Sequence, residues 1–542
     1  MTETNSGLYE ILKQVAERQP DKIAISYFGV QLTYKELIDD IDRTALAFRK
    51  HGVGRGDIIC ISLPSLPESL MSFYALNKIG AVPCMFDVRY TPAQVCEIVD
   101  RTQAKMLFIM AFTSKTLAFS KLQPNVEKVV VVNGVSLIPK VEWWYGFGEW
   151  FNGKRRVFMG KNRNKYIHWK DFISVTQDKD EEPPYRWQPD EMMSLFQTSG
   201  TTGTVKSVML STENILHSVF PDPPTLNNPS NDDTVLCFLP IFAFYGTNAL
   251  VISLSFGMRT VIIPFLRHKD FLKNINKHRP QHIFSVPAYW DVLVKETDNK
   301  EDLSYLKSIF VAGDVLNAAF EKSINAFLRE RNSPVDITKA YGMTETAGIV
   351  ASTPPDCPKK YELGFSGIPN SCYEVKTFDD EICVRSTMKL LGYYKNEEAT
   401  NELIQTHPDG SQWLHTGDMG YVDENGYIYI IGRKKRMIVR YDGSKIFPIE
   451  IEDCLMQHPS VKTCAVVPIQ DPDHSESKQP KAFVVLKDAS KNSPSTIEEL
   501  MRYCKKNLPD HLVPMAIEII NVMPVNTNGK VDYKKLIARS KD

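Results

Sequence analysis

A loop rich in glycine and hydroxyl side chains is the strongest chemical signal in this sequence. The segment SLFQTSGTTGTVKSVMLS (194–211) passes from an apolar run into residues 198–204, which are all Thr, Ser or Gly, and then reaches Lys206. Glycines let backbone N–H groups approach an anion, hydroxyls donate hydrogen bonds, and the lysine adds positive charge. The pattern predicts a polyphosphate-binding loop, although it does not match the Walker pattern G-x-x-x-x-G-K-[ST]. By composition alone, a flexible surface loop remains the alternative.

Four further motifs follow this loop along the chain. They are YGMTET at 341–346, HTGD at 415–418, GRKK at 432–435 and NGK at 528–530. In this order, the five motifs resemble those of the adenylate-forming superfamily, which includes acyl-CoA synthetases, adenylation domains and firefly luciferase. The resemblance extends from Leu8 to Leu536 and is weakest over residues 136–187. It implies an enzyme that joins a carboxylate to the α-phosphate of ATP, expels pyrophosphate and passes the acyl group to a thiol.

The resemblance implies which residues contact the phosphates and the metal. The β and γ phosphates would be held by Thr198, Ser199, Gly200, Thr201, Thr202, Gly203, Thr204 and Lys206. Thr344 would bond the α-phosphate, and Glu345 would hold Mg²⁺, a hard cation that prefers carboxylate and phosphate oxygens. Cations and fixed donors suit this reaction because negative charge builds up on the phosphate oxygens. A capping or solvated acid is the alternative for Glu345.

The adenosine half of ATP is assigned in the same way. The predicted contacts are Gly313, Asp314, Val315, Tyr341, Gly342, Met343, Asp418 and Arg433. Gly313 to Val315 resemble the segment along the adenine edge, and Tyr341 offers a ring that could stack on the base. Asp418 would accept both ribose hydroxyls. Without the neighbouring motifs, Asp418 would be an ordinary turn acid.

The resemblance also gives roles to residues near the C-terminus. Lys530 would be catalytic, since a compact ammonium can bridge the substrate carboxylate and the α-phosphate and reduce their repulsion. Otherwise it would be a solvated surface lysine. The predicted catalytic set is Lys530, Thr344, Glu345 and Lys206. Lys435 matches a hinge, about which a small domain would turn a second face toward the thiol of coenzyme A. That face would carry Arg440, Gly443 and Lys445.

The acyl pocket is the next feature that the resemblance locates. Its border would be formed by Phe242, Ala243, Phe244 and Tyr245. Aromatic walls, and no aspartate in this segment to pair with an amino acid's ammonium group, favour a fatty or other apolar acid. The phosphate loop departs from the family pattern at Val205 and Ser207, where proline and glycine are usual.

The predicted function is an AMP-forming ligase that uses ATP, Mg²⁺ and coenzyme A on a small carboxylic acid. One alternative is a stand-alone adenylation enzyme that loads a carrier protein, a branch that residues 528–536 also resemble. The other is a catalytically silent nucleotide-binding or membrane-associated scaffold. The altered loop and the Trp-rich, basic segment 141–156, which could contact a membrane peripherally, motivate it.

Composition excludes some broader classes. The 542 residues carry 64 Lys+Arg against 65 Asp+Glu, a net charge of -1, so the basic excess of a general nucleic-acid binder is missing. Ten scattered cysteines without a C-x-x-C pair and a first segment without a secretory pattern predict a cytoplasmic protein. The uncharged stretch 234–258 could span a membrane by length. Because Pro240 and Gly257 interrupt it, we expect two buried strands and a core helix instead.

The motifs need a scaffold that brings them together. Helical patterns alternate with short apolar runs near the N-terminus, at 7–18, 22–27, 33–51 and 57–63. This alternation predicts an α/β architecture in which helices pack on sheets. We expect a large domain at 1–432, elaborated over 136–187, and a small mobile α+β domain at 433–542.

Overall fold

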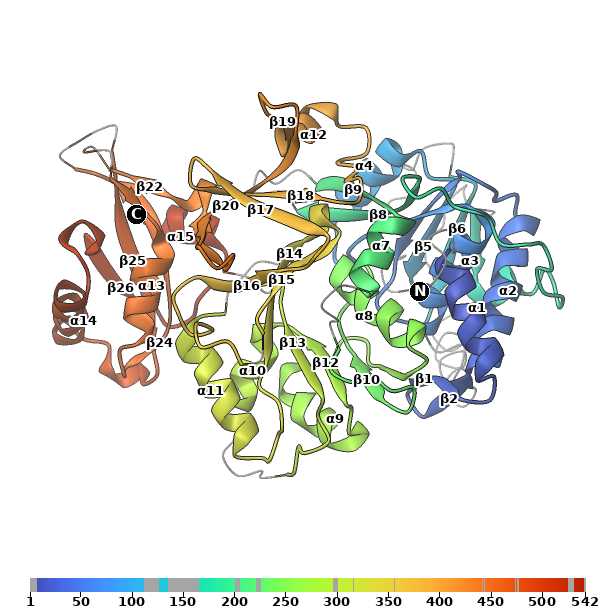
Figure 1. The fold of residues 1–542 in the computed structure, drawn as a ribbon, viewed down its shortest axis with the longest axis horizontal. Helices are drawn as coiled ribbons and strands as arrows, with labels where there is room; N and C mark the ends of the chain where they lie inside the picture. Colours follow the sequence, from blue (N-terminus) through green and yellow to red (C-terminus); the bar gives the residue numbers. More distant parts are fainter. Residues whose placement is uncertain are drawn as a thin grey trace, which may run out of the picture.

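A computed structural model gives the fold of the chain (Figure 1). It describes residues 7–111, 126–134, 165–199, 205–220, 226–295, 301–314, 316–354, 356–440, 442, 444–472, 474, 477–524 and 531–540. A large N-terminal domain precedes a small C-terminal domain, and both combine helices with sheets, so the predicted fold class is confirmed. The boundary at residue 432 stays a prediction. Outside the described residues lie segment 136–164, the side chain of Ser199, and these predicted site residues: Gly200, Thr201, Thr202, Gly203, Thr204, Val315, Gly443 and Lys530.

The first sheet of the large domain has the strand order β7-β6-β5-β3-β4-β8-β9. Its strands are β3 (Ile58–Ser62), β4 (Val82–Met85), β5 (Met106–Met110), β6 (Lys128–Val132), β7 (Tyr166–His168), β8 (Met192–Ser199) and β9 (Val205–Ser211). Neighbours run parallel except β8 and β9, which form an antiparallel pair. Strands β3, β4 and β5 are buried along their whole length, as expected for parallel strands covered on both faces. The predicted phosphate loop connects β8 to β9.

The second sheet has the order β17-β18-β20-β21-β16-β15-β14-β13-β12-β10-β11-β1-β2, with β19 beside β20. Its strands are β1 (Ile23–Tyr27), β2 (Val30–Thr33), β10 (Thr234–Cys237), β11 (Arg259–Ile262), β12 (His282–Ser285), β13 (Ser308–Val311), β14 (Thr338–Met343), β15 (Gly348–Ser352), β16 (Phe365–Pro369), β17 (Tyr373–Phe378), β18 (Glu381–Ser386), β19 (Ile404–Thr406), β20 (Gln412–Val422) and β21 (Ile428–Arg433). From β14 to β1 the strands run parallel, and from β14 to β17 they run antiparallel. Strand β14 therefore lies where the sheet changes from parallel to antiparallel pairing, and its carboxyl end carries the YGMTET motif. Such ends are where open α/β sheets bind ligands.

Helices pack around both sheets of the large domain (Figure 1). They are α1 (Leu8–Arg18), α2 (Tyr34–Lys50), α3 (Pro67–Ile79), α4 (Pro92–Thr102), α6 (Trp169–Ile173), α7 (Thr212–Val219), α8 (Phe244–Ser255), α9 (Phe271–His278), α10 (Pro287–Leu293), α11 (Ala318–Arg329) and α12 (Glu397–Leu403). The described end of the predicted elaboration forms β7 and α6. Strand β7 extends the first sheet beside β6, and α6 buries Trp169 and Phe172 in the main core. This part of the elaboration therefore belongs to the fold of the large domain.

The uncharged stretch 234–258 is buried, as expected, but its second predicted strand is wrong. The stretch contains strand β10 and the buried helix α8, whereas the next strand, β11, begins only at Arg259. Gly257, with φ at +74°, makes the turn that separates the helix from β11. Among the described residues, no helix is both long enough and apolar enough to cross a membrane.

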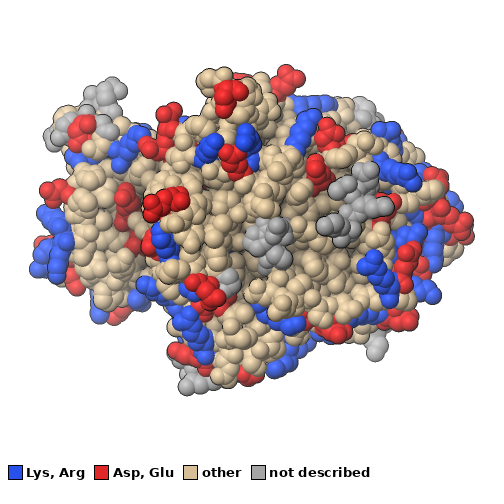
Figure 2. All heavy atoms as spheres, in the orientation of Figure 1, with Lys and Arg blue, Asp and Glu red and all other residues tan. Residues whose placement is uncertain are grey.

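The small domain has a core of its own. Its elements are β22 (Ile438–Val439), β23 (Lys445–Ile446), α13 (Pro448–Met456), β24 (Val461–Gln470), β25 (Lys478–Leu486), α14 (Pro494–Asn507), β26 (Ala516–Ile519) and α15 (Tyr533–Arg539). Two clusters of buried apolar side chains pack on the sheet β24-β25-β26, and all their residues lie between Ile438 and Ile537. On the face shown in Figure 2, charged side chains of both signs are interspersed over both domains.

Candidate active site

The predicted phosphate loop lies between two strands of a hairpin that contacts a distant part of the chain. Thr198 pairs with Lys206 across β8 and β9, directly before and after the loop. Backbone hydrogen bonds tie β9 to residues 392–394. This contact places the Lys206 Nζ atom 4.7 Å from the ring centroid of Tyr393. The lysine therefore stands over an aromatic face beside the predicted phosphate site.

The two departures from the family pattern take part in bracing this hairpin. The Ser207 hydroxyl donates to the Gln197 side-chain oxygen at 2.8 Å and accepts from the Arg101 guanidinium at 3.0 Å. Arg101 also donates to the backbone carbonyl of Val205 at 2.8 Å. These bonds fix both strands next to the loop, so a serine here adds support that a glycine could not give.

Glu345 faces the same hairpin from the end of β14. It lies in a short 3₁₀ turn, η6 (Thr344–Thr346), directly after that strand. Its Oε1 atom accepts hydrogen bonds from the Tyr393 hydroxyl at 2.9 Å and from the Thr198 hydroxyl at 3.3 Å. Burial, followed by the charge of Glu345, raises the pKa of Tyr393, so the phenol stays a neutral donor. Thr198 before the predicted phosphate loop, the predicted metal ligand Glu345 and Tyr393 thus form one group.

The surroundings of Glu345 fit a magnesium ion. Within the described residues, Glu345 accepts hydrogen bonds from two hydroxyl groups, which leave carboxylate lone pairs available. Mg²⁺ is bound in proteins by one or two carboxylates together with phosphate oxygens and water. A carboxylate beside a polyphosphate loop supplies this kind of ligand.

Tyr341 and Asp418 form a second group. The Tyr341 hydroxyl donates to Asp418 Oδ2 at 2.7 Å, and the Arg433 guanidinium pairs with Asp418 Oδ1 at 2.8 Å. The strand register places Asp418 opposite Arg433 on β20 and β21. Burial and the nearby Asp418 raise the pKa of Tyr341. Asp418 is 3% exposed and its carboxylate pairs with a guanidinium, an arrangement that suits an acceptor of ribose hydroxyls.

The segment between these two groups is tightly packed. A Cβ atom on Gly342 would lie 1.9 Å from the carbonyl oxygen of Gly348, so only glycine fits there. Met343 and Thr344 follow it and are half-buried. Gly313 and Asp314 are exposed after β13, the neighbour of β14 in the sheet. The predicted adenine edge and α-phosphate contact therefore lie on adjacent strand ends.

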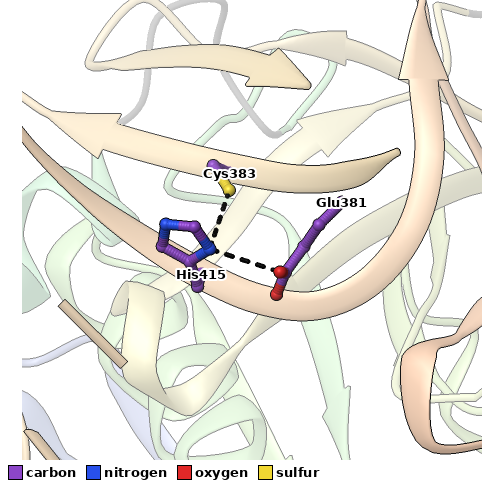
Figure 3. A group of neighbouring side chains, drawn as sticks. All are labelled: Glu381, Cys383 and His415. Atoms are coloured by element: carbon purple, nitrogen blue, oxygen red, sulfur yellow. Dashed lines mark hydrogen bonds and ion pairs between the residues drawn. The ribbon is translucent and has the colours of Figure 1, made fainter. Parts of the chain in front are cut away.

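A buried hydrogen-bond network lies beside Asp418 and was missed by sequence reasoning (Figure 3). Glu381 Oε1 accepts from the Gly417 N–H at 2.8 Å, and Oε2 accepts from the Lys434 ammonium at 2.9 Å. His415 Nδ1 lies 3.2 Å from the same Oε2 and 3.4 Å from Cys383 Sγ. The carboxylate therefore connects Gly417, the residue before Asp418, to Lys434, the residue before the predicted hinge at Lys435.

The same side chains could be considered as metal ligands. The ligand atoms of Glu381, Cys383 and His415 lie within 4.8 Å of one another. However, the Lys434 ammonium already neutralises the carboxylate. Burial, followed by the charge of Glu381, raises the pKa of the Cys383 thiol to about 12, which disfavours the thiolate that a metal needs. We interpret the cluster as a hydrogen-bond network.

The small domain contacts the large one close to these groups. Lys435 is exposed in a 3₁₀ turn, η7 (Lys434–Arg436), directly after β21. Lys445 pairs with Asp380 of the large domain at 2.8 Å, at the turn between β17 and β18. Tyr533, three residues after Lys530, has its pKa raised by burial, by Glu452 and also by Asp314. Asp314 of the predicted adenine edge is therefore close enough to Tyr533 for its charge to act on the phenol.

The predicted acyl-pocket residues lie at the start of α8. Phe242 and Phe244 are buried, and Ala243 is the N-cap residue of the helix. The Phe244 ring packs edge-on against Phe196 of β8 at 5.3 Å. Burial raises the pKa of Tyr245, whose hydroxyl lies 3.4 Å from the Ser285 carbonyl. The predicted acyl-pocket residues therefore lie next to the strand that leads into the predicted phosphate loop.

Comparison with known proteins places these features in context. The family model described as "AMP-binding enzyme" matches residues 12–394, and the "AMP-binding enzyme C-terminal domain" model matches residues 450–530. A putative acyl-CoA synthetase, YngI, of Bacillus subtilis is 28% identical over 98% of this chain and 96% of its own length. The long-chain-fatty-acid–CoA ligase of the same organism is 27% identical over 98% and 94%. The crystal structure of the anthranilate CoA ligase AuaEII with anthranoyl-AMP shares the fold, with a TM-score of 0.83 and 23% identity over 99% and 98% of the two chains.

Proposed function

Since this chain belongs to the AMP-binding enzyme family and is an AMP-forming acyl-CoA ligase, we propose a role for each site residue and a class of acid substrate. The acid is a fatty or other largely apolar carboxylic acid. It is activated as its acyl-adenylate, and the acyl group is then transferred to coenzyme A.

One observation carries the assignment of the nucleotide site. Tyr341 and Glu345 are four residues apart on a single segment, and each contacts a different group of polar side chains. Tyr341 bonds to Asp418, the proposed ribose acceptor, while Glu345 bonds to Thr198 at the phosphate loop. A nucleotide with its ribose at the first group and its β and γ phosphates at the second would have its α-phosphate beside Thr344.

The proposed chemistry follows from the charges at this place. A carboxylate oxygen of the acid attacks the α-phosphorus, and the bond from that phosphorus to pyrophosphate breaks. Two anions must meet, so positive groups lower the barrier. Lys206 supplies charge at the loop, and Lys530 would join the acid carboxylate to the α-phosphate. Mg²⁺, held by Glu345, would neutralise phosphate charge when bound.

In the second step, the acyl group passes from the adenylate to the thiol of coenzyme A. The sulfur of coenzyme A attacks the acyl carbonyl carbon, and AMP leaves with the bonding electrons. We propose that the small domain turns about Lys435 between the two steps, which would withdraw Lys530 and present the face of Arg440, Gly443 and Lys445. This rotation would break the ion pair that Lys445 makes with Asp380.

The apolar acid is supported by the pocket border. Phe242, Phe244 and the neighbouring Phe196 form aromatic walls, and no acid lies in the segment 242–245 to pair with a substrate ammonium group. Two of the relatives named above act, by their names, on a long-chain fatty acid and on anthranilate. The acid panel described next therefore includes both aliphatic and aromatic acids. We also propose that the enzyme acts in the cytoplasm.

An acid panel tests this function. Pyrophosphate release from Mg-ATP is measured for acids from acetate to palmitate, for benzoate and for amino acids, each with and without coenzyme A. We expect release with an apolar acid, and a CoA thioester that appears only when coenzyme A is present. Adenylate formation that is indifferent to coenzyme A would favour a carrier-protein acceptor. No release with any acid would support the silent scaffold.

A further inference from the structure

One buried side chain on α8 has a polar atom that no described residue pairs with. Asn248 is 2% exposed. Its Nδ2 atom donates to the Ser218 hydroxyl of α7 at 2.6 Å, whereas its Oδ1 atom has no hydrogen-bond partner among the described residues. Buried polar atoms are almost always paired, so an unpaired one needs an explanation.

The other buried polar side chains of this helix behave differently. The Thr247 hydroxyl donates to the Ile241 carbonyl, and the Ser253 hydroxyl pairs with Thr260 at 2.6 Å. Both bonds are internal to the fold and complete. Asn248 therefore differs from the other two buried polar residues of α8. Loose packing of the whole helix would not explain this difference, because it would affect all three.

The position of Asn248 connects it to the acyl pocket. It lies four residues after Phe244, so both side chains are on the same face of α8. Its partner Ser218 packs against Gly348 at the start of β15, and Phe244 packs against the same glycine. Helices α7 and α8 lie side by side and both contact β15 (Figure 1).

Gly348 links this place to the nucleotide site. It follows η6, the turn that carries Thr344 and Glu345, by two residues. Asn248 is thus linked, through Ser218 and Gly348, to the turn where we propose that the acid carboxylate meets the α-phosphate. An acyl group that extends from that carboxylate along Phe244 would approach Asn248.

We propose that Asn248, held by Ser218, is a specificity-determining residue that accepts a hydrogen bond from the acyl group. The inference rests on the proposed function and narrows its substrate class. The preferred acid has an apolar body that carries an uncharged hydroxyl or aromatic amino group at a distance from the carboxylate. Such a donor pairs with Oδ1, whereas a plain hydrocarbon leaves the oxygen unpaired.

The test compares matched acids in the full-length enzyme. ATP–pyrophosphate exchange gives kcat/KM for benzoate against 4-hydroxybenzoate and 2-aminobenzoate, cinnamate against 4-hydroxycinnamate, and octanoate against 8-hydroxyoctanoate. We expect at least one donor-bearing acid to exceed its parent by about tenfold or more. In Asn248→Leu, we expect the ratio for that pair to fall to about twofold or less.

Two further variants keep the outcome clear. Ser218→Ala removes the group that orients the amide and should also reduce the ratio, which covers the case in which Asn248→Leu does not fold. Ser253→Ala, on the same helix but bonded to Thr260, should leave the ratio unchanged. The inference is overturned if the wild type turns over parent acids but prefers no donor-bearing acid, or if the preference survives Asn248→Leu. Failure of every acid would instead overturn the proposed function, and this inference with it.

Discussion

The Tyr341 hydroxyl donates a 2.7 Å hydrogen bond to the buried carboxylate of Asp418, 77 residues further along the chain. This bond joins the carboxyl end of β14 to β20, two strands that are separated in the sheet by β15, β16 and β21. Arg433 completes the arrangement from β21. The proposed ribose acceptor is therefore fixed by three strands before any nucleotide binds.

Asp418→Asn should weaken ATP binding. The substitution removes the charge that pairs with Arg433 and the acceptor that we propose for the ribose hydroxyls. Hydrogen bonds to charged groups contribute about 1.5 to 3 kcal/mol, so we expect the ATP dissociation constant to rise about 10- to 100-fold. Calorimetric titration with ATP measures it. Tyr341→Phe, which removes one donor and keeps the charge, should have a smaller effect, and equal affinities for all three proteins would refute the assignment of Asp418.

Glu345→Gln should impair the use of magnesium. The amide cannot replace a carboxylate as a ligand for a hard cation, so we expect pyrophosphate exchange to fall by about 100-fold or more and half-saturation to need more Mg²⁺. The exchange rate is measured as a function of Mg²⁺ concentration. Tyr393→Phe is the matched control, since it removes only a hydrogen bond to Glu345 and keeps the carboxylate. Wild-type Mg²⁺ dependence in Glu345→Gln would show that this acid does not hold the metal.

Glu381→Gln should lower stability in a pH-dependent way. Burial alone would raise the pKa of Glu381, but hydrogen bonds from Lys434, His415 and the Gly417 amide outweigh it and hold the pKa below its ordinary value of 4.5. A lowered carboxyl pKa adds stability above the unfolded pKa, and this contribution is lost as the pH falls through the folded pKa.

The expected pH dependence follows from the lowered pKa of Glu381. At pH 7 we expect a smaller free energy of unfolding for Glu381→Gln than for the wild type, and the difference should shrink as the pH falls below about 4.5. Urea denaturation over this pH range measures it. Glu424→Gln, at an exposed acid, should show little difference at any pH. A difference that does not change with pH would indicate that the charge of Glu381 is not the cause.

The sequence allowed much of the site to be predicted because several functional residues lie in short continuous motifs. Lys206, Glu345 and Asp418 stand in segments whose residue types suit the ligands that we propose for them, and such segments can be recognised without knowing the fold. The α/β class followed from alternating patterns, since helices and strands have different periods.

Other features could not be predicted, because they depend on pairing between distant elements. Tyr393 reaches Glu345 only because β9 is bonded to residues 392–394. The contact of Glu381 with Lys434 depends on how β18, β20 and the turn after β21 meet. In the uncharged stretch 234–258, the absence of charge indicated burial but did not fix where the helix ends and the next strand begins.

Lys530→Ala should separate the two half-reactions. We expect adenylation, measured by ATP–pyrophosphate exchange, to fall by about 100-fold or more, because the ammonium that joins two anions is lost. Thioester formation from preformed acyl-adenylate and coenzyme A should fall by much less, since the domain rotation would remove this lysine from the site. Lys534→Ala, at an exposed lysine of α15, is the control and should match the wild type in both assays. Unchanged exchange in Lys530→Ala would refute the role of this residue.

The central claim is that the acid passes through an acyl-adenylate. The direct test supplies an acid accepted in the panel with ¹⁸O in both carboxylate oxygens, together with Mg-ATP and coenzyme A, and analyses the products by mass spectrometry. We predict AMP that carries one ¹⁸O atom, together with unlabelled pyrophosphate and a CoA thioester. Unlabelled AMP, or label in a phosphate released with ADP, would contradict attack of the carboxylate on the α-phosphorus.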